Sequence, residues 1–461
     1  MTTFIDTSLS LSNRDTLSYR EKPFSDRLSG KNAFYEHPEY INNTFNDLHS
    51  AKILPTSYTW NTEHKIMRIA KQILPIFAFS IGLCLIGKVS LIKIAVGIGT
   101  YKLIQLVAGL LILPASLTTF SLNSSRTESN NRLLNKLRVD TLDETIKNKW
   151  MCKRITIEVD GYKIDSIIIG KPSLLDKGRW TLVSNGNGML YEFNMLSKHS
   201  ITLLSGNDDT LRSGNDDTLR SGNDDTLRSG NDDTLKKNNT LRSILNEYKS
   251  NAILFNYPGV GASSGLPNKQ AMVKAYRAIL TFLEDKEKGI GATEIIGYGH
   301  SIGGGIQGEV LKTHSLKNDI KYIFIKDKTF SSLSEQVSLM IGKILGLVMT
   351  GKILGSLIKL LGWEMDSVES SKKLQVKEII IQTTKRTSGH NLKNIDDLAD
   401  NDQLIIKESC LAFKLLKEKA TANKYFLGTT SSHNQPLSQH TIQRLSEMIH
   451  NTFSSKDEQM A

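Results

Sequence analysis

The stretch "EIIGYGHSIGGG" (residues 294–305) decides the fold. Its short apolar start predicts a buried strand. Gly299 to Gly303 then reads G-H-S-I-G, and "IQGEVLKTH" (306–314) favours a helix. A serine in a sharp turn between strand and helix has its hydroxyl lifted clear of the sheet, and flanking glycines avoid the clashes that a Cβ would make there. The stretch therefore predicts a nucleophile, Ser301, in a turn that includes His300.

The surrounding sequence favours an α/β fold. "KRITIEVDGYKIDSIIIG" (153–170) predicts a hairpin around Asp160-Gly161. Continuous apolar runs, typical of parallel strands buried on both faces, follow at 180–184, 252–256, 294–298, 322–325, 378–382 and 425–428. Segments such as 268–288 have helical spacing of apolar residues. We therefore expect a mostly parallel, eight-stranded sheet with helices on both faces.

A catalytic serine needs a base and an orienting acid, in the chain order Ser, Asp or Glu, His for this arrangement. His433 follows the last apolar run, in "YFLGTTSSHNQP", and is the candidate base. The later His440 and His450 lie in a segment with helical spacing, where we expect surface residues.

The acid should follow the run at 378–382, where four aspartates compete. We choose Asp402, because "NDQLI" leads into the helical "KESCLAFKLL", and Asp400 is the alternative. The other two are Asp396 and Asp397.

The loop after the run at 180–184 reads "NGNG" (185–188). Glycines there allow a substrate to approach the backbone closely. We expect the N–H groups of Asn187 and Ile302 to form the oxyanion hole, the pair of donors that binds the negative oxygen of the reaction intermediate.

These motifs, with "FNYPGVGASSG" (255–265) and "DKTFSSLS" (327–334), resemble the α/β-hydrolase superfamily from about residue 152 to the C-terminus. Within it the chain is similar to a chlamydial hydrolase group and to the SidB-like secreted effectors of Legionella. That resemblance implies a lipase-like serine hydrolase, made in the bacterial cytoplasm and delivered into a host cell. Such effectors carry a C-terminal export signal, with which "SSKDEQMA" is compatible. Asn185 stands where the superfamily usually has histidine.

Differences in amino-acid composition divide the chain into regions. We expect a polar, loosely ordered region over 1–60, a helical hydrophobic region over 61–150 and the hydrolase domain over 151–461. The apolar stretch 66–122 fits either membrane association or a buried helical hairpin. The N-terminus lacks the basic start and apolar core of a cleavable signal peptide.

Residues 333–366 are expected to form a helical lid. Lys343, Lys352 and Lys359 are its only charges between Glu335 and Glu364, and "GKILG" occurs twice, with glycines spaced to let helices approach closely. A cationic apolar lid suits a lipid at an anionic interface. The alternative is a soluble pair of cap helices.

The octapeptide repeat over 205–236 shares a Gly-Asn-Asp-Thr-Leu string with calcium-binding toxin repeats. Those repeats need a period of about nine residues and paired glycines, which this unit lacks. We interpret the repeat as an expanded surface loop, whose in-register deletion should leave activity largely intact.

The net charge of +11 favours an anionic partner, and no nucleic-acid-binding motif is found, so we expect a membrane surface. Cys84, Cys152 and Cys410 are widely separated, which argues against a zinc site and a disulfide framework. The expected chemistry is hydrolysis of acyl or lipid esters without a cofactor or metal. Acyl transfer or thioester hydrolysis by the same triad is one alternative, and a non-catalytic membrane-docking scaffold is another.

Overall fold

The computed structural model describes most of the chain from residue 151 onward. Described are helical residues 99, 101, 102, 104, 105, 108, 109 and 112, and residues 151–160, 162–171, 174, 178–187, 190–191, 240–261, 263–286, 289–385 and 388–454. The polar region 1–60, most of 61–150, the repeat 205–236 and residues 455–461 lie outside the described residues, so the predictions made for them stay predictions.

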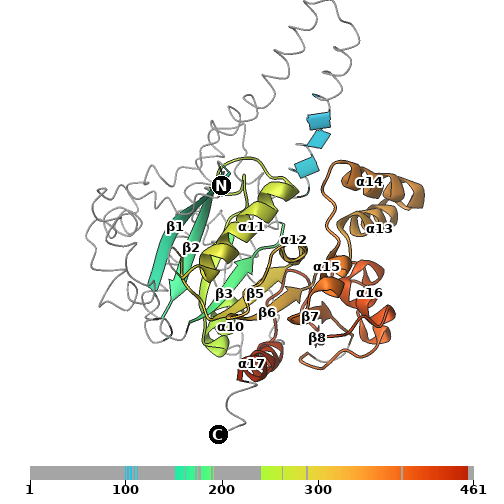
Figure 1. Cartoon of the computed structure of the whole chain (residues 1–461). Helices are drawn as coiled ribbons and strands as arrows, with labels where there is room; N and C mark the ends of the chain where they lie inside the picture. The colour runs from blue at the N-terminus through green and yellow to red at the C-terminus, as the bar shows by residue number, and fades with distance from the viewer. Residues whose placement is uncertain are drawn as a thin grey trace, which may run out of the picture.

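The core of the molecule is one eight-stranded sheet (Figure 1). Its strands are β1 (Met151–Val159), β2 (Tyr162–Gly170), β3 (Arg179–Ser184), β4 (Asn251–Phe255), β5 (Glu294–His300), β6 (Lys321–Asp327), β7 (Lys377–Thr383) and β8 (Lys424–Thr429). They lie in the order β1-β2-β4-β3-β5-β6-β7-β8. β2 runs antiparallel to β1 and β4, and all other neighbours are parallel. The predicted mostly parallel sheet is confirmed, and its strand order is that of the α/β-hydrolase fold.

Strand register brings the candidate loops to one edge of the sheet. Ser184 pairs with Gly299, and His300 pairs with Asp327, at the carboxyl ends of β3, β5 and β6. β7 and β8 end level with each other at Thr383 and Thr429. The loops after these five strands therefore start beside one another, where ligands bind in open α/β sheets.

Alternating side chains of the strands feed two hydrophobic cores, one on each face. On β6, Phe324 packs into one core and Ile325 into the other. The first core is covered by α11 (Lys269–Glu284), α12 (Ile302–Leu311), α15 (Ser367–Lys373) and α16 (Leu411–Lys417). The second is covered by α10 (Thr240–Tyr248) and α17 (Gln439–Ser454). The sheet is thus buried on both sides, which explains the continuous apolar runs.

Two antiparallel helices, α13 (Leu333–Leu345) and α14 (Val348–Leu360), form a hairpin over the segment expected to be a lid. A Cβ added at Gly355 would lie 2.6 Å from the Ser334 carbonyl oxygen, and one at Gly351 would clash with the Ser338 carbonyl. The turn passes through Gly346, in the left-handed conformation at φ 65°. Gly351 and Gly355, of the second GKILG copy, therefore let the helices pack closely as predicted, whereas Gly346 of the first copy forms the turn.

The described helical residues of the N-terminal region dock at the end of α14. The Tyr101 hydroxyl donates to the Leu360 carbonyl at 3.0 Å, and Gln105 Nε2 donates to the Leu361 carbonyl at 2.9 Å. Gly109 lies so close to Pro267 and Trp363 that a Cβ would clash. In the part of the chain that the structure describes, no helix is both long and apolar enough to cross a bilayer.

Candidate active site

Ser301 occupies a strained turn between β5 and α12. Its backbone has φ 54° and ψ −120°, which is unfavourable for a side chain with a Cβ. Its N–H donates to the Asp327 carbonyl at 2.9 Å, and the residue is 8% exposed. A Cβ at Gly299 would lie 2.7 Å from Gly304 Cα, so glycine is needed there. This geometry holds the Ser301 side chain at the carboxyl edge of the sheet.

The N-terminus of α12 packs directly on the loop after β3. A Cβ at Gly303 would clash with the Ser184 carbonyl and lie 2.8 Å from the Asn185 oxygen. The first N–H groups of a helix have no intrahelical acceptor and carry partial positive charge, so they suit a developing anion. Ile302, the first residue of α12, supplies one such N–H.

The buried residues of the loop after β3 are fixed by hydrogen bonds. The Asn185 carbonyl accepts from the Tyr257 hydroxyl at 3.0 Å, and Asn185 Nδ2 donates to the Phe255 carbonyl at 3.4 Å. Asn187 follows as an exposed turn residue. The loop that holds Asn187 therefore lies beside the first turn of α12, and the role of its N–H stays a prediction.

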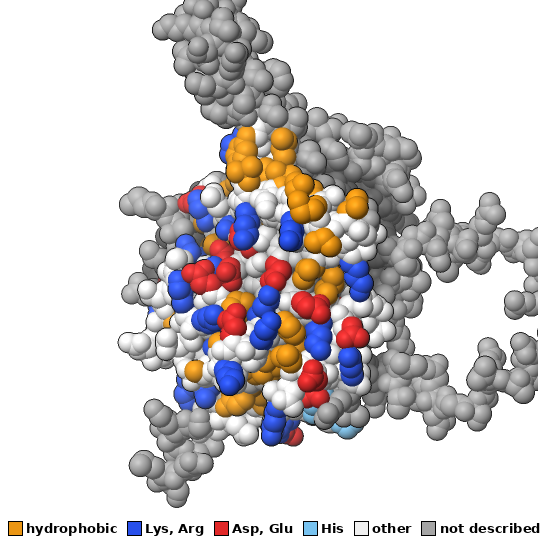
Figure 2. Space-filling view, turned by 90° about the vertical axis from the view of Figure 1, so that its right-hand side faces the viewer, with side chains coloured by type: hydrophobic (Ala, Val, Ile, Leu, Met, Phe, Trp, Pro, Cys, Tyr) orange, Lys and Arg blue, Asp and Glu red, His pale blue; other side chains and the backbone are white. Residues whose placement is uncertain are grey.

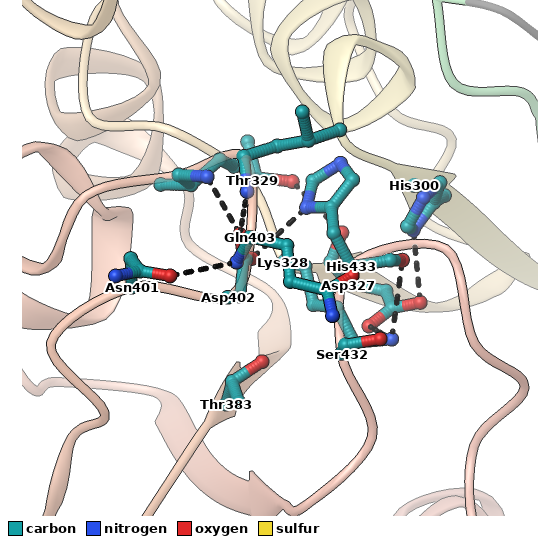
Figure 3. Close-up of polar contacts among 12 residues, drawn as sticks. His300, Asp327, Lys328, Thr329, Thr383, Asn401, Asp402, Gln403, Ser432 and His433 are labelled. Atoms are coloured by element: carbon teal, nitrogen blue, oxygen red, sulfur yellow. Dashed lines mark hydrogen bonds and ion pairs between the residues drawn. The ribbon is translucent and has the colours of Figure 1, made fainter. Parts of the chain in front are cut away.

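His433 and Asp402 form a buried pair (Figure 3). His433 Nδ1 lies 2.9 Å from Asp402 Oδ2, and the His433 backbone N–H donates to the Asp402 carbonyl at 2.8 Å. Asp402 Oδ1 accepts the N–H groups of Leu404, at 3.1 Å, and Ile405, at 2.6 Å. A carboxylate in this position keeps the proton on Nδ1 and leaves Nε2 free to accept one.

Asp400, the alternative acid, points elsewhere. Its carboxylate lies 3.0 Å from Lys385 Nζ and is largely exposed, and the Lys385 ammonium lowers the pKa of Asp400. The structure thus places Asp402, not Asp400, beside the histidine. His440 and His450 are exposed on α17.

The Ser301 turn meets the candidate base through the neighbouring residue, His300. Among the described residues, no hydrogen bond joins the Ser301 hydroxyl to the His433 imidazole. The residue beside Ser301 makes the contact: the His300 and His433 rings have centroids 4.9 Å apart. Catalytic hydrogen bonds are often long or absent in structures without substrate, so a missing Ser301–His433 bond is compatible with a triad.

His300, which is partly buried, belongs to a second pair with the buried Asp327, and the sequence did not reveal it. His300 Nδ1 lies 3.1 Å from Asp327 Oδ2, and the Tyr298 hydroxyl donates to the same oxygen at 2.7 Å. Burial lowers the pKa of His300, against the pull of the Asp327 carboxylate. Burial would raise the pKa of Asp327, but the Lys328 ammonium and the His300 contact hold it well below its usual range.

Lys328 connects this pair to the loop of the candidate base. Its fully buried side chain reaches toward that loop, and Nζ donates to the Gln435 carbonyl at 3.2 Å and the His433 carbonyl at 3.5 Å. Nζ also lies 3.9 Å from Asp327 Oδ1. The signal in the sequence was "DKT", two charged residues at the end of an apolar strand. Within the described residues, no cluster of histidine, cysteine and acidic side chains could hold a metal ion.

Solved structures similar to this chain include several hydrolases. A Vibrio vulnificus α/β-hydrolase is 14% identical with TM-score 0.44, and the match covers 76% of this chain and 93% of that one. The Pyrococcus furiosus esterase Pf2001 is 12% identical with TM-score 0.40, covering 67% and 92%. Acetyl xylan esterase 1 from Thermoanaerobacterium sp. is 11% identical with TM-score 0.38, covering 70% and 94%. Similarity this distant does not bear on activity, so the fold assignment rests on the strand order.

A comparison with curated proteins finds no match. A family model does match, over residues 47–207 and 218–454, which is most of the chain. Its description agrees with the chlamydial resemblance, while the similarity to SidB-like effectors stays a prediction. The chain belongs to the Chlamydia CHLPS protein family (DUF818).

Proposed function

We propose that this protein is a serine hydrolase that cleaves carboxylic esters of acyl chains or lipids. The observation that carries the proposal is the convergence of Ser301, in its strained turn, with the buried His433–Asp402 pair at one edge of the sheet. These are the nucleophile, base and orienting acid of a triad, in the chain order typical of this fold.

In the proposed reaction, Ser301 Oγ attacks the acyl carbonyl carbon while His433 Nε2 takes the hydroxyl proton. The carbonyl π electrons move to oxygen, and the N–H groups of Ile302 and Asn187 stabilise that oxyanion. His433 returns the proton to the departing alcohol, which leaves an acyl-enzyme. Water, deprotonated by the same imidazole, then releases the acid and regenerates Ser301. Asp402 holds the imidazole in one tautomer and stabilises its charged form.

The proposed substrates are lipids at a membrane. The α13–α14 hairpin supports this, because its first turn is bonded to the loop that carries Asp402. Gln336 Nε2 donates to the Leu404 carbonyl at 2.7 Å, and the Leu404 N–H donates to Asp402. A hairpin so placed is suited to act as a lid.

The test is labelling by a fluorophosphonate probe, together with hydrolysis of short p-nitrophenyl esters. Wild-type protein should do both, and Ser301→Ala should do neither. Ser315→Ala is a matched control, because Ser315 is exposed in the loop between α12 and β6. A wild-type protein that neither labels nor hydrolyses would contradict the proposal. Labelling without hydrolysis would favour acyl transfer, which assays with added alcohol or thiol acceptors would detect.

A further inference from the structure

Large apolar side chains are exposed along the hairpin and the helical residues beside it. Ile344 and Met349 are 69% and 70% exposed. We call the set the apolar face; it consists of Tyr101, Ile104, Ile344, Leu347, Val348, Met349, Ile353 and Leu360. Figure 2 shows hydrophobic side chains gathered toward the upper end of the side that α13 and α14 occupy, with lysines or arginines between them. Contiguous apolar surface of this kind marks an interaction site.

The packing of α13 against α14 does not require these large apolar side chains. The contact between α13 and α14 is made by small residues, with Gly351 and Gly355 against Ser334 and Ser338. The large apolar residues near the turn therefore point away from the helix–helix contact. A soluble pair of cap helices would bury such residues between them.

Beyond Glu335, in the first turn of α13, the charges on the hairpin are all positive. Lys343, Lys352 and Lys359 are exposed, and no acidic residue lies between Glu335 and Glu364. A helical surface that combines exposed apolar residues with lysines binds anionic lipid, because the apolar part enters the headgroup boundary and the ammonium groups meet phosphates. A protein partner would need an acidic apolar surface to match, and an identical copy would bring lysine against lysine.

The N-terminal helical residues extend the same face. Tyr101 and Gln105 are tied to the end of α14 by hydrogen bonds, and Tyr101 and Ile104 are exposed beside Leu360. Exposed apolar side chains from two parts of the sequence thus lie side by side, Tyr101 and Ile104 beside Leu360.

We propose that the apolar face docks on an anionic lipid bilayer, with the turn from Ile344 to Met349 entering the headgroup boundary and the three lysines lying on lipid phosphates. The inference rests on the proposed function in one respect: the bilayer is then also the source of the acyl-ester substrate. Because α13 begins against the Asp402 loop, docking would hold the carboxyl edge of the sheet near the lipid surface.

The experiment places an environment-sensitive nitrobenzoxadiazole label on the full-length chain at Met349→Cys. Cys84 and Cys152 are replaced by serine, and Cys410 stays because it is buried. The control label sits at Lys249→Cys, an exposed position after α10 on the other face of the sheet. Each protein is mixed with phosphatidylcholine vesicles, with or without phosphatidylglycerol, carrying brominated acyl chains as quenchers.

We expect a blue-shifted, quenched signal at position 349 with phosphatidylglycerol vesicles and none at position 249. Changing Lys343, Lys352 and Lys359 together to glutamate should weaken this binding at least about tenfold. The proposal is overturned if label 349 stays unquenched on bound protein, if both labels are quenched alike, or if label 349 shifts with protein concentration in the absence of vesicles, which would indicate a second copy.

Two further measurements separate this proposal from the proposed function. Ser301→Ala carrying label 349 should dock like the active chain. The triple glutamate variant should still hydrolyse a soluble short ester at the wild-type rate. If the wild-type chain docks but never hydrolyses esters, the docking proposal stands and the proposed function is wrong. If it hydrolyses esters but does not dock, the proposed function stands and the docking proposal is wrong.

Discussion

The imidazole of His300 lies beside that of His433, with ring centroids 4.9 Å apart and ring planes at 47°. Each ring has its own buried carboxylate, Asp327 for His300 and Asp402 for His433. Burial lowers the pKa of His300, and the neighbouring imidazole acts in the same direction. We therefore expect His300 to be neutral at neutral pH.

His300→Gln should make folding stability less dependent on pH. Burial lowers the pKa of His300 in the folded protein, so below the ordinary histidine value the unfolded chain binds a proton that the folded chain does not. Stability is then lost as pH falls between about 7 and 5. Glutamine removes this loss, and urea unfolding at the two pH values would show it. His450→Gln, at an exposed position, should keep the wild-type pH dependence.

Asp402→Asn should lower ester hydrolysis about 10⁴-fold at neutral pH, because an amide no longer holds the reactive tautomer of His433. The variant should remain folded, since the oxygen of the new side-chain amide can still accept the two backbone N–H groups that Asp402 accepts. Initial rates with a p-nitrophenyl ester measure the effect. Asp400→Asn is the control, because that carboxylate is exposed and paired with Lys385. Equal loss in both variants would contradict the assignment.

Gly351→Ala should loosen the hairpin, because the new Cβ would clash with the Ser338 carbonyl. Gly342→Ala is a matched control: a Cβ there meets its nearest atom, Val348 Cα, at 3.6 Å, an ordinary contact. Alanine also favours a helix over glycine by up to about 1 kcal/mol. Amide hydrogen exchange over α13 and α14 should therefore speed up in the first variant and not in the second.

Glu378→Gln should destabilise the fold by about 3–5 kcal/mol, because it leaves the buried Lys326 ammonium without a counter-ion. Lys326 Nζ lies 2.9 Å from Glu378 Oε1, and both side chains are buried. Urea unfolding measures the loss. Replacing both residues by apolar ones, Lys326→Met with Glu378→Leu, should recover most of it. If the single change had no effect, the pair would not be structurally important.

The sequence is sufficient to predict the sheet, because short apolar runs predict the strands and the glycines around Ser301 predict the turn there. The chain order Ser, Asp, His predicts Asp402 as the acid and His433 as the base, and the two side chains lie within hydrogen-bond distance. The sequence defines the acid less well, because four aspartates share one loop and only the directions of their side chains distinguish them. Asp402 turns inward to His433, while Asp400 turns outward to Lys385.

The buried charges could not be predicted. Lys326, Lys328 and Glu378 look like ordinary surface residues in a linear reading, because charged side chains are rarely buried. Their partners lie on neighbouring strands or loops far along the chain: Lys326 meets Glu378, and Lys328 reaches the loop of His433. Only the fold brings such pairs together, so a local pattern carries no sign of them.

The glycine contact between α13 and α14 has a consequence for evolution. Because the two helices touch through Gly351, Gly355 and their serine neighbours, the outward side chains contribute little to holding the hairpin together. Substitutions there can accumulate without unfolding it. Substitutions at positions such as Met349 could therefore change which surface the hairpin contacts, while the turn around Ser301 stays unchanged.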